Sequence, residues 1–492
     1  MPQTLKSRIV FGVFWQTIGN GGTQVLQFFI SVCLARLLSP KEFGVVAILS
    51  VFIVIGGIIL DCGWGTALVQ RKELDNADCS SVFWINLVTA LVLYAGLWIS
   101  APLISTFYDD TTLTPLLRVL GVVLLIGSLT IVHNALLLRR LLFNLRFRIT
   151  WSALIVSGGV GIALAFAGYG VWALVFQQLS NAFTRSVATF FCIHWLPDRR
   201  FEWQKLKGLL KFGGNIFVVQ LVDKVSVDFI QLLIGKMFNF ETLSYYNRGN
   251  SLAALSRSMN DSICSVMFPA FSRLQGNLES LRNTFLRSLE GSIFFICYFS
   301  AFLIVMAKPL ILFIYGEAWL PTVIFLQLAA VCSFFGPIHL LNLHVINSLG
   351  HSEIFLQLEI TKKITLIFII IATYRWGILC MLWGMVGYNL ISFLLNAWPN
   401  IKLIQITPWQ QIKLSLPSLC STGLAMTGIL FLVKTLYNYN LFWQLMISGI
   451  TYSLLFFLFA LLMKNRILWW GYKALMTELT AKMIHRRKEC IK

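Results

Sequence analysis

Polar and charged side chains recur on single helical faces within long apolar runs of this chain. In the run 212–237, five such residues fall within an arc of about 140° at 100° per residue. They are Gln220, Asp223, Lys224, Asp228 and Gln231. One interpretation is a polar wall of a water-filled cavity, in which Lys224 binds an anion. The other is a structural cluster, because Asp223, Lys224 and Asp228 lie within a turn of each other and neutralise one another.

Three further apolar runs carry similar faces. The residues are Gln16, Asn20, Gln24 and Gln27 in 11–35, Gln177, Asn181 and Arg185 in 171–195, and Asn247, Asn250, Arg257 and Asp261 in 243–270. A charge at the bilayer centre costs at least about 2.5–3.5 kcal/mol on insertion scales, so these faces are expected to line a cavity. The alternative is hydrogen bonding between helices, at about 0.6 kcal/mol per bond. Arg257 and Asp261 are also spaced for an ion pair.

Two aspartates occupy corresponding positions of a weak internal repeat. Shifting the sequence by 200 residues places Asp61 on Asp261, with other landmarks in the same order. Asp61 and Asp261 are therefore candidates for coupling or gating, through either an ion pair that locks the two lobes or a proton-binding site. Asp228 is a third candidate for the same role. The intramembrane His133, His339 and His344 have no Cys or acidic partner at metal-ligand spacing and are expected to pack between helices. No metal and no cofactor is expected.

Composition indicates the environment of these faces. Of 492 residues, 58% are hydrophobic and 12% are charged, whereas a soluble chain carries roughly 25% charged residues. Apolar runs of about 20 residues cross a bilayer as helices and are too long and continuous for barrel strands. The sequence therefore predicts an all-α integral membrane protein with about fourteen transmembrane helices. The predicted spans are 11–35, 43–69, 81–107, 114–138, 149–168, 171–195, 212–237, 243–270, 289–315, 319–347, 355–374, 376–400, 412–436 and 441–463.

The repeat predicts two pseudo-symmetric six-helix lobes around a central cleft, related by an axis along the membrane normal. Two C-terminal helices lie outside the repeat. The predicted divisions are 1–200 for the N-lobe with spans 1 to 6, 201–400 for the C-lobe with spans 7 to 12, 401–465 for spans 13 and 14, and 466–492 for a basic amphipathic cytoplasmic tail.

Basic residues predict the orientation. The net charge of +19 comes from Lys and Arg that gather between alternate spans, as at 139–148 and 199–211, where the positive-inside rule places them in the cytoplasm. Nucleic acid is therefore not an expected partner. The short basic start, 1–8, has no signal-cleavage pattern. We expect a multi-pass protein of the bacterial inner membrane with both termini in the cytoplasm.

Motifs for several enzyme and pump classes are missing from the sequence. It contains no G-x-x-x-x-G-K-[ST] loop for ATP-driven export and no G-x-S-x-G or H-E-x-x-H motif. The ten cysteines are scattered without a C-x-x-C pair. No predicted external loop is large enough to carry catalytic residues. The sequence therefore predicts a secondary or substrate-gradient-driven transporter rather than an enzyme.

Short motifs extend this prediction along nearly the whole chain. They are LLSPKEFG at 37–44, DCG at 61–63, ALVQ at 67–70, FWIN at 83–86, GVWALV at 170–175, YYNRG at 245–249, PAFSRL at 269–274 and GEAW at 316–319. Each is mostly turn and packing residues, but the ordered set resembles the Wzx-type polysaccharide flippases. The resemblance is closest to the colanic-acid-exporter-like branch of the polysaccharide transporter family, in the MOP/MATE-like superfamily.

The resemblance implies a fold and an activity. Family members move undecaprenyl-pyrophosphate-linked oligosaccharide, the repeat unit of exopolysaccharide, capsule or O-antigen of lipopolysaccharide, from the inner to the outer leaflet. They do so by alternating access of two six-helix lobes, with spans 1, 2, 7 and 8 lining the central cleft. The implied partners are this lipid-linked substrate, the bilayer, and a polysaccharide polymerase with its chain-length machinery.

A physical assignment of site residues follows. The sugar–pyrophosphate head is anionic, so Lys224, Arg257 and Arg185 are predicted to hold the pyrophosphate. Amides are predicted to hydrogen-bond sugar hydroxyls. The remaining cavity candidates are Gln16, Asn20, Gln24, Gln220, Asp223 and Asn181.

Three alternatives remain open at the level of sequence. A multidrug or organic-cation antiporter of the same architecture would need a cleft of acidic character. A lipid II flippase would differ in its substrate. A membrane polysaccharide polymerase or ligase, from a different functional class, would need a sizeable external loop.

Overall fold

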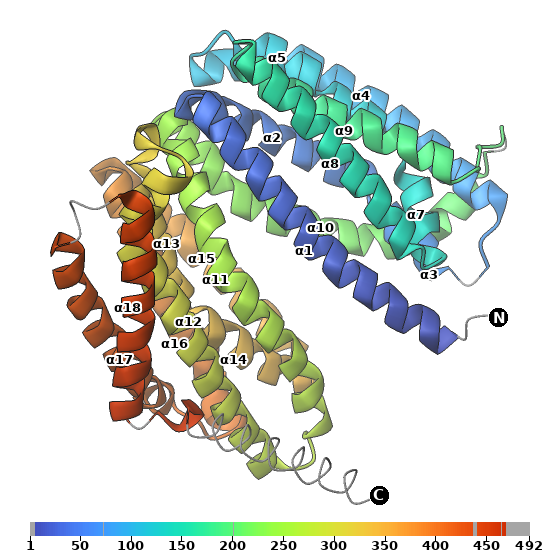
Figure 1. Ribbon diagram of the computed structural model, residues 1–492. Helices are drawn as coiled ribbons and strands as arrows, with labels where there is room; N and C mark the ends of the chain where they lie inside the picture. The colour runs from blue at the N-terminus through green and yellow to red at the C-terminus, as the bar shows by residue number, and fades with distance from the viewer. Residues whose placement is uncertain (1–4, 72, 200, 436–439, 464, 469–492) are drawn as a thin grey trace, which may run out of the picture. The chain divides into compact units, whose positions relative to one another are not determined.

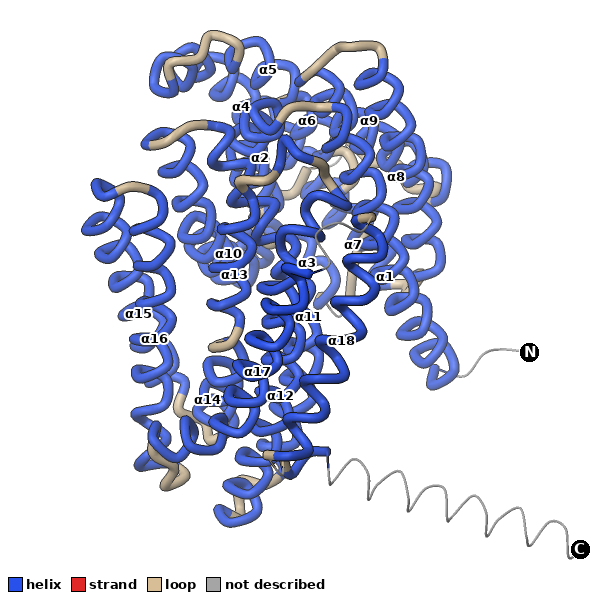
Figure 2. Tube along the Cα trace, turned by 60° about the vertical axis from the view of Figure 1, so that its left-hand side comes forward, coloured by secondary structure: helices blue, strands red, loops and turns tan. Residues whose placement is uncertain are grey.

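The computed structural model describes residues 5–71, 73–199, 201–435, 440–463 and 465–468. Within these ranges the side chains of 5–20, 259, 431–435 and several positions between 204 and 219 lie outside the description. The described chain is helical with short connections and contains no strand (Figure 2). Packing divides it into two compact units, Met1–Ser244 and Tyr245–Lys492, called unit 1 and unit 2 below.

Unit 1 is built from ten helices and the first turn of an eleventh (Figure 1). They are α1 (Leu5–Leu37), α2 (Pro40–Asp61), α3 (Trp64–Gln70), α4 (Asn76–Tyr108), α5 (Leu113–Leu120), α6 (Val122–Ser128), α7 (Ile131–Arg139), α8 (Phe143–Phe166), α9 (Val171–Cys192), α10 (Trp203–Met237) and α11 (Phe240–Arg273). Helix α8 packs against both α9 and α1, and α10 packs against α2, α3 and α4.

Local sequence explains where helix α2 begins and ends. Ser39 is its N-cap in a capping box with Glu42, whose Oε2 accepts the Ser39 backbone N–H at 2.6 Å, and Pro40 occupies the first turn. The helix ends where Cys62 and Gly63 adopt positive φ angles of 42° and 76°. This turn redirects the chain into α3.

Unit 2 contains most of α11 and the remaining helices. They are α12 (Leu278–Ile314), η1 (Glu317–Trp319), α13 (Thr322–Ser333), α14 (Gly336–Ser348), α15 (Ser352–Thr373), η2 (Tyr374–Trp376), α16 (Ile378–Leu403), α17 (Pro408–Thr435) and α18 (Leu441–Leu462). Helix α12 packs against α13, α14, α17 and α18, while α15 pairs with α16.

Helix length and composition agree with a membrane protein. Each predicted span falls on a helix or on a run of consecutive helices. Among the described residues, seven helices are long and apolar enough to cross a membrane, or eight if the pair Leu113–Ser128 and Ile131–Arg139, bent by 43°, is one span. Helices α1, α9, α10, α11, α15 and α17 are not among them, and the described side chains of α1 form a shorter apolar stretch, Gly21–Leu37. The count of fourteen spans stays a prediction.

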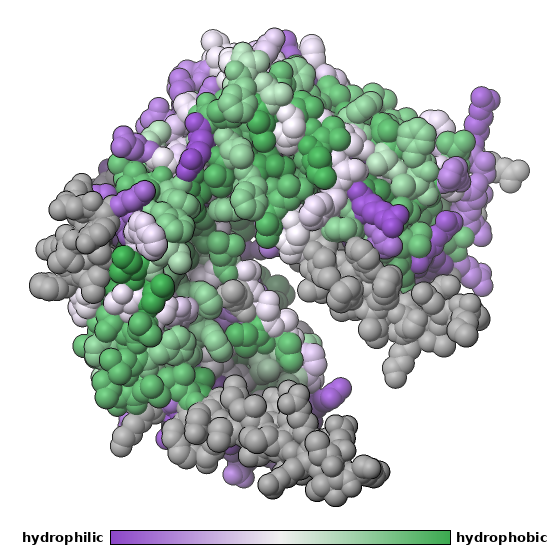
Figure 3. Space-filling model, in the orientation of Figure 1, coloured by the Kyte–Doolittle hydropathy of each residue, from purple (hydrophilic) through white to green (hydrophobic). Residues whose placement is uncertain are grey.

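The surfaces of the units are apolar where lipid would contact them. Figure 3 shows hydrophobic residues over the middle of the visible helices and hydrophilic residues toward helix ends. Exposed large side chains include Ile99 and Leu103 of α4, Phe183 of α9 and Phe368 of α15. Contiguous exposed apolar surface of this extent is typical of a membrane-embedded protein.

The division by packing differs from the predicted lobe boundary at 200/201. Helix α10, which the repeat assigns to the C-lobe, packs against helices of unit 1. The predicted lobes therefore stay a prediction derived from the repeat. Most of the predicted amphipathic tail, 469–492, lies outside the described residues.

Candidate functional site

A polar cavity of about 750 Å³ lies inside unit 1, among α1, α6, α7, α8 and α9. Its polar lining consists of one guanidinium, five carboxamides and four hydroxyls. These are Arg185, Gln27, Asn134, Gln177, Gln178, Asn181, Thr23, Thr130, Thr150 and Ser157. Two of the sequence-predicted site residues, Asn181 and Arg185, thus face the same cavity.

Glycines of α8 allow the helices around this cavity to approach closely. A Cβ added at Gly158 would lie 2.5 Å from Ile30 of α1, and one at Gly161 would lie 3.0 Å from Gln177 of α9. Both distances are shorter than ordinary van der Waals contact. Small residues at these positions therefore set how near α1 and α9 bring their polar faces to α8.

Hydrogen bonds hold several of the lining amides. Asn181 Nδ2 donates to Ser157 Oγ at 3.1 Å, and Gln178 Nε2 donates to Ser50 Oγ of α2 at 3.2 Å. The Arg185 guanidinium donates to Thr150 Oγ1 at 3.4 Å, a long hydrogen bond to a neutral group. Among the described residues, no carboxylate lines the cavity.

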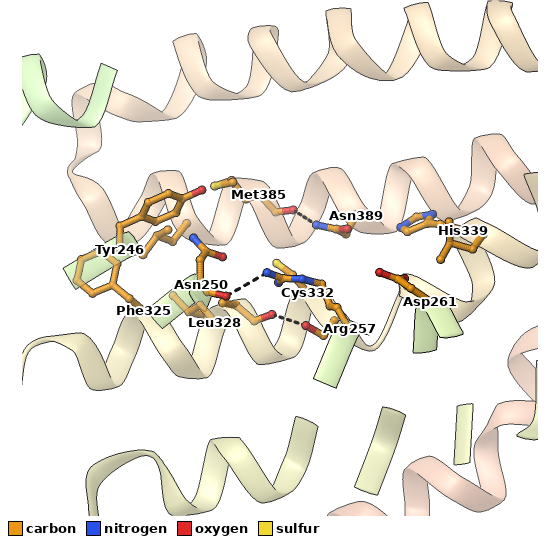
Figure 4. A pocket seen from close by; sticks show the side chains of 15 residues that line it. Tyr246, Asn250, Arg257, Asp261, Phe325, Leu328, Cys332, His339, Met385 and Asn389 are labelled. Carbon is orange, nitrogen blue, oxygen red and sulfur yellow. Dashed lines mark hydrogen bonds between the residues drawn. The ribbon is translucent and has the colours of Figure 1, made fainter. Parts of the chain in front are cut away.

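A second cavity, of about 400 Å³, lies inside unit 2 among α11, α13, α14 and α16 (Figure 4). Arg257 and Asp261 of α11 line it, together with Asn250, His339 and Asn389. Tyr246 and Phe325 stand at one end of the cavity in Figure 4, while Asp261 and His339 stand at the other. This cavity therefore combines a cation, an anion and an imidazole.

The ion pair expected between Arg257 and Asp261 does not form. The Arg257 guanidinium donates to the backbone carbonyl of Asn250 at 3.1 Å, as Figure 4 shows. Neither residue has an ion pair among the described residues. The hydrogen bond to Asn250, seven residues earlier, holds the guanidinium toward the N-terminal end of α11. The two residues have the spacing of an ion pair, but their charged groups do not come within ion-pair distance.

The charged residues of α10 do form a pair. Lys224 Nζ lies 3.0 Å from Asp228 Oδ1, and that oxygen also accepts Gln231 Nε2 at 2.9 Å. Asp228 is only 1% exposed, so Lys224 compensates a buried charge. The arrangement supports the structural interpretation of this cluster. Gln220 and Asp223 are exposed on the same helix.

The remaining candidates divide among several surroundings. Asp61 Oδ1 accepts the backbone N–H of Gly65 at 3.2 Å, across the break between α2 and α3. Its repeat mate Asp261 instead faces a cavity, so the two acids do not share a local role. Gln24 is exposed and is not part of the cavity lining. The side chains of Gln16 and Asn20 lie outside the described residues.

Sequence reasoning missed several lining residues. Thr150 and Ser157 of α8 and Thr130 before α7 face the unit 1 cavity, but isolated hydroxyls in an apolar run give no periodic signal. His339, expected only to pack between helices, lines the unit 2 cavity. The sequence could not predict this, because the cavity forms only where α14 packs beside α11 and α16.

Comparison with known proteins identifies the group to which the chain belongs. The family described as polysaccharide biosynthesis protein matches residues 33–324, more than half of the chain. The chain belongs to this family. Its similar relatives include the succinoglycan biosynthesis transport protein ExoT of Rhizobium meliloti, 26% identical over 65% of this chain and 65% of the relative, just under two thirds of its length.

Two further relatives match over longer segments. The teichuronic acid biosynthesis protein TuaB of Bacillus subtilis is 23% identical over 82% of this chain and 85% of its own length. The lipopolysaccharide biosynthesis protein WzxC of Escherichia coli is 22% identical over 84% and 85%. These matches confirm the predicted membership of a polysaccharide biosynthesis family that includes a relative named WzxC.

Solved structures show the same fold. The lipid II flippase MurJ in an inward closed conformation has a TM-score of 0.73 at 15% identity, covering 92% of this chain and 99% of that one. An inward-facing MATE multidrug transporter of the MOP superfamily has a TM-score of 0.59 at 16% identity, covering 80% and 95%. The predicted all-α transporter fold is confirmed.

Proposed function

We propose that this chain moves undecaprenyl-pyrophosphate-linked oligosaccharide from the inner to the outer leaflet of the bacterial inner membrane by alternating access. The repeat unit belongs to an exopolysaccharide, a capsule or an O-antigen. The proposal is supported by membership of the polysaccharide biosynthesis family and by relatives named for transport and for polysaccharide synthesis. The likeness to the lipid II flippase supports the fold that the activity needs.

The observation that carries the proposal is a cavity in each unit that is lined by a guanidinium together with carboxamide side chains. The head group of such a substrate is large, polar and anionic, so the hydrocarbon core blocks its passage. Guanidinium and amide groups inside each unit lower that barrier by replacing water around the head group. The polyprenyl tail needs no such help, since it is stable in the bilayer throughout.

In unit 2, Arg257 is the candidate for the pyrophosphate. Its guanidinium is held by one backbone carbonyl and keeps donors free for a phosphate, which it can bind through two parallel hydrogen bonds. In unit 1, Lys224 reaches an anion only when its ion pair with Asp228 opens. Sugar contacts by Gln16, Asn20, Gln24 and Gln220 belong to the same proposal.

We assign the coupling of transport to proton movement to Asp261. It faces His339 across the unit 2 cavity (Figure 4), where a carboxylate and an imidazole can exchange a proton. Asp61 accepts a backbone N–H of α3 and Asp228 pairs with Lys224, so we assign both to holding their helices in place. The orientation with both termini in the cytoplasm, and partnership with a polymerase and its chain-length machinery, are further parts of the proposal.

Export of cell-surface polysaccharide tests the assignment of Arg257. We expect Arg257→Gln to abolish export in a strain that depends on this chain, while the amount of membrane-inserted protein stays unchanged. Arg273→Gln, which removes an exposed arginine at the end of the same helix, is the matched control and should export normally. Export by the Arg257→Gln strain at the level of the control would remove Arg257 from the substrate site.

An organic-cation antiporter is disfavoured by the lining of the cavities. Such a protein needs a carboxylate free to bind the cation. The unit 1 cavity has none, and in the unit 2 cavity the charge of Asp261 is balanced by that of Arg257 nearby.

A further inference from the structure

Arg185 is the charged member of an otherwise neutral cavity. The unit 1 cavity brings its guanidinium together with five carboxamides and four hydroxyls, and the part of the lining that the structure describes holds no carboxylate. Each of these carboxamides and hydroxyls can both donate and accept a hydrogen bond. The cavity is therefore built for a polar ligand that carries negative charge.

The guanidinium lacks a counter-charge within the described structure. Its one hydrogen bond runs to Thr150 Oγ1 at 3.4 Å, and no ion pair involves it among the described residues. Arg146, one turn before Thr150 on α8, adds a like charge that acts on it. A guanidinium beside a like charge and without a counter-charge is electrostatically unfavourable. A bound anion would supply the missing partner.

The neutral groups indicate what accompanies the anion. Asn181 and Gln178 are held by Ser157 and Ser50, which fixes the orientation of their amide groups. Pre-oriented amides from α9, facing hydroxyls of α8 and Gln27 of α1, match the alternating donors and acceptors of sugar hydroxyls. A volume of about 750 Å³ lies within the roughly 300–1,000 Å³ of cavities that hold small molecules.

We propose that the unit 1 cavity binds an acidic sugar residue of the transported glycan, with its carboxylate on Arg185 and its hydroxyls on the surrounding amides. The inference rests on the proposed function, since it assigns a feature of the lipid-linked substrate. One lining guanidinium matches one carboxylate through a planar, two-bond contact. The proposed function already assigns the pyrophosphate to Arg257 of unit 2, which leaves a charged sugar as the ligand of this lining.

Binding to the purified full-length chain in lipid nanodiscs tests the proposal. The probes are methyl β-D-glucuronide, the neutral methyl β-D-glucoside and inorganic pyrophosphate, measured by titration calorimetry. We expect the glucuronide to bind at least about tenfold more tightly than the glucoside. Arg185→Gln should remove that difference. Arg185→Lys should restore part of it, because lysine returns the positive charge but cannot donate two parallel hydrogen bonds to one carboxylate. Arg148→Gln, which removes an exposed arginine of α8 outside the cavity, should bind as the wild type does.

Two results would overturn the proposal. One is equal binding of the two glycosides to the wild type. The other is pyrophosphate binding that exceeds glucuronide binding and disappears in Arg185→Gln, which would assign Arg185 to the lipid carrier. Should Arg185→Gln fail to fold, Ala182→Leu serves instead, since a larger side chain in the lining should exclude the glucuronide. Flipping in vesicles is a separate measurement, so loss of the proposed function would leave the binding result standing.

Discussion

Charged residues on these helices are either paired with an opposite charge or bonded to neutral groups. Lys224 and Asp228 neutralise one another at 3.0 Å, whereas the hydrogen bonds of Arg185 and Arg257 to other described residues go to neutral oxygens. Charges that are already paired stabilise a helix bundle, and those left with neutral partners are available to a ligand. The distinction could not be read from spacing, because the pairs Lys224–Asp228 and Arg257–Asp261 are both four residues apart.

The pairing of Lys224 with Asp228 gives a prediction about stability. Lys224→Gln should lower the free energy of unfolding by about 1–3 kcal/mol, because it leaves a buried carboxylate without its cation. The double variant Lys224→Gln/Asp228→Asn should regain most of this stability and should export polysaccharide. Thermal unfolding in detergent and an export assay provide the two readouts. A double variant that is stable yet exports nothing would show that Lys224 contacts the substrate.

In each unit a single residue determines how neighbouring helices pack together. In unit 1, Gly44 of α2 lies against the backbone at the start of α11, where an added Cβ would come within 1.8 Å of the Phe240 carbonyl oxygen. In unit 2, Asn342 connects three helices: it donates to Gln411 of α17 at 2.8 Å and accepts from Asn400 of α16 at 2.6 Å. All three amides are fully buried.

Gly44 should tolerate no larger residue. Gly44→Ala forces α2 and α11 apart, and we expect a cost of about 3 kcal/mol or a failure to accumulate in the membrane. Gly57→Ala is the control on the same helix, since its added Cβ would meet nothing within 4 Å. That control should be neutral or stabilising by up to about 1 kcal/mol. Equal melting temperatures for the two variants would contradict the close contact.

Asn342→Leu should loosen the attachment of α17. The substitution keeps the side-chain volume but leaves Asn400 and Gln411 without their shared partner, at a cost of about 1–3 kcal/mol. Asn347→Leu, at a half-buried position of the same helix, should cost less. Thermal unfolding and the rate of proteolysis between α16 and α17 measure the effect. Unchanged values for Asn342→Leu would mean that the amide network adds no stability.

The sequence predicted much of the element scale and less of the site. Continuous apolar runs located the helices, since length alone identifies a membrane-crossing segment. The breaks within these runs, at Cys62–Gly63 and around Thr130, depend on backbone angles and packing that hydropathy does not record. Polar periodicity found Asn181 and Arg185, but not Thr150 and Ser157, which reach the same cavity from a neighbouring helix.

For the whole molecule, the distribution of Lys and Arg predicts an orientation that can be measured directly. In a background without native cysteines, Thr111→Cys between α4 and α5 should react with a membrane-impermeant maleimide applied to intact spheroplasts. Gly276→Cys between α11 and α12 should react only after the membrane is opened. Both positions are exposed. The opposite pattern would place the termini outside the cytoplasm.

The central claim is that this chain carries a lipid-linked oligosaccharide across a bilayer. The most direct test reconstitutes the purified chain in liposomes containing a fluorescent undecaprenyl-pyrophosphate-linked oligosaccharide and follows its appearance in the opposite leaflet. We predict transfer well above that of protein-free liposomes for the wild type and for Arg273→Gln, and no such transfer for Arg257→Gln. Transfer by the folded wild type no faster than in protein-free liposomes would contradict the account.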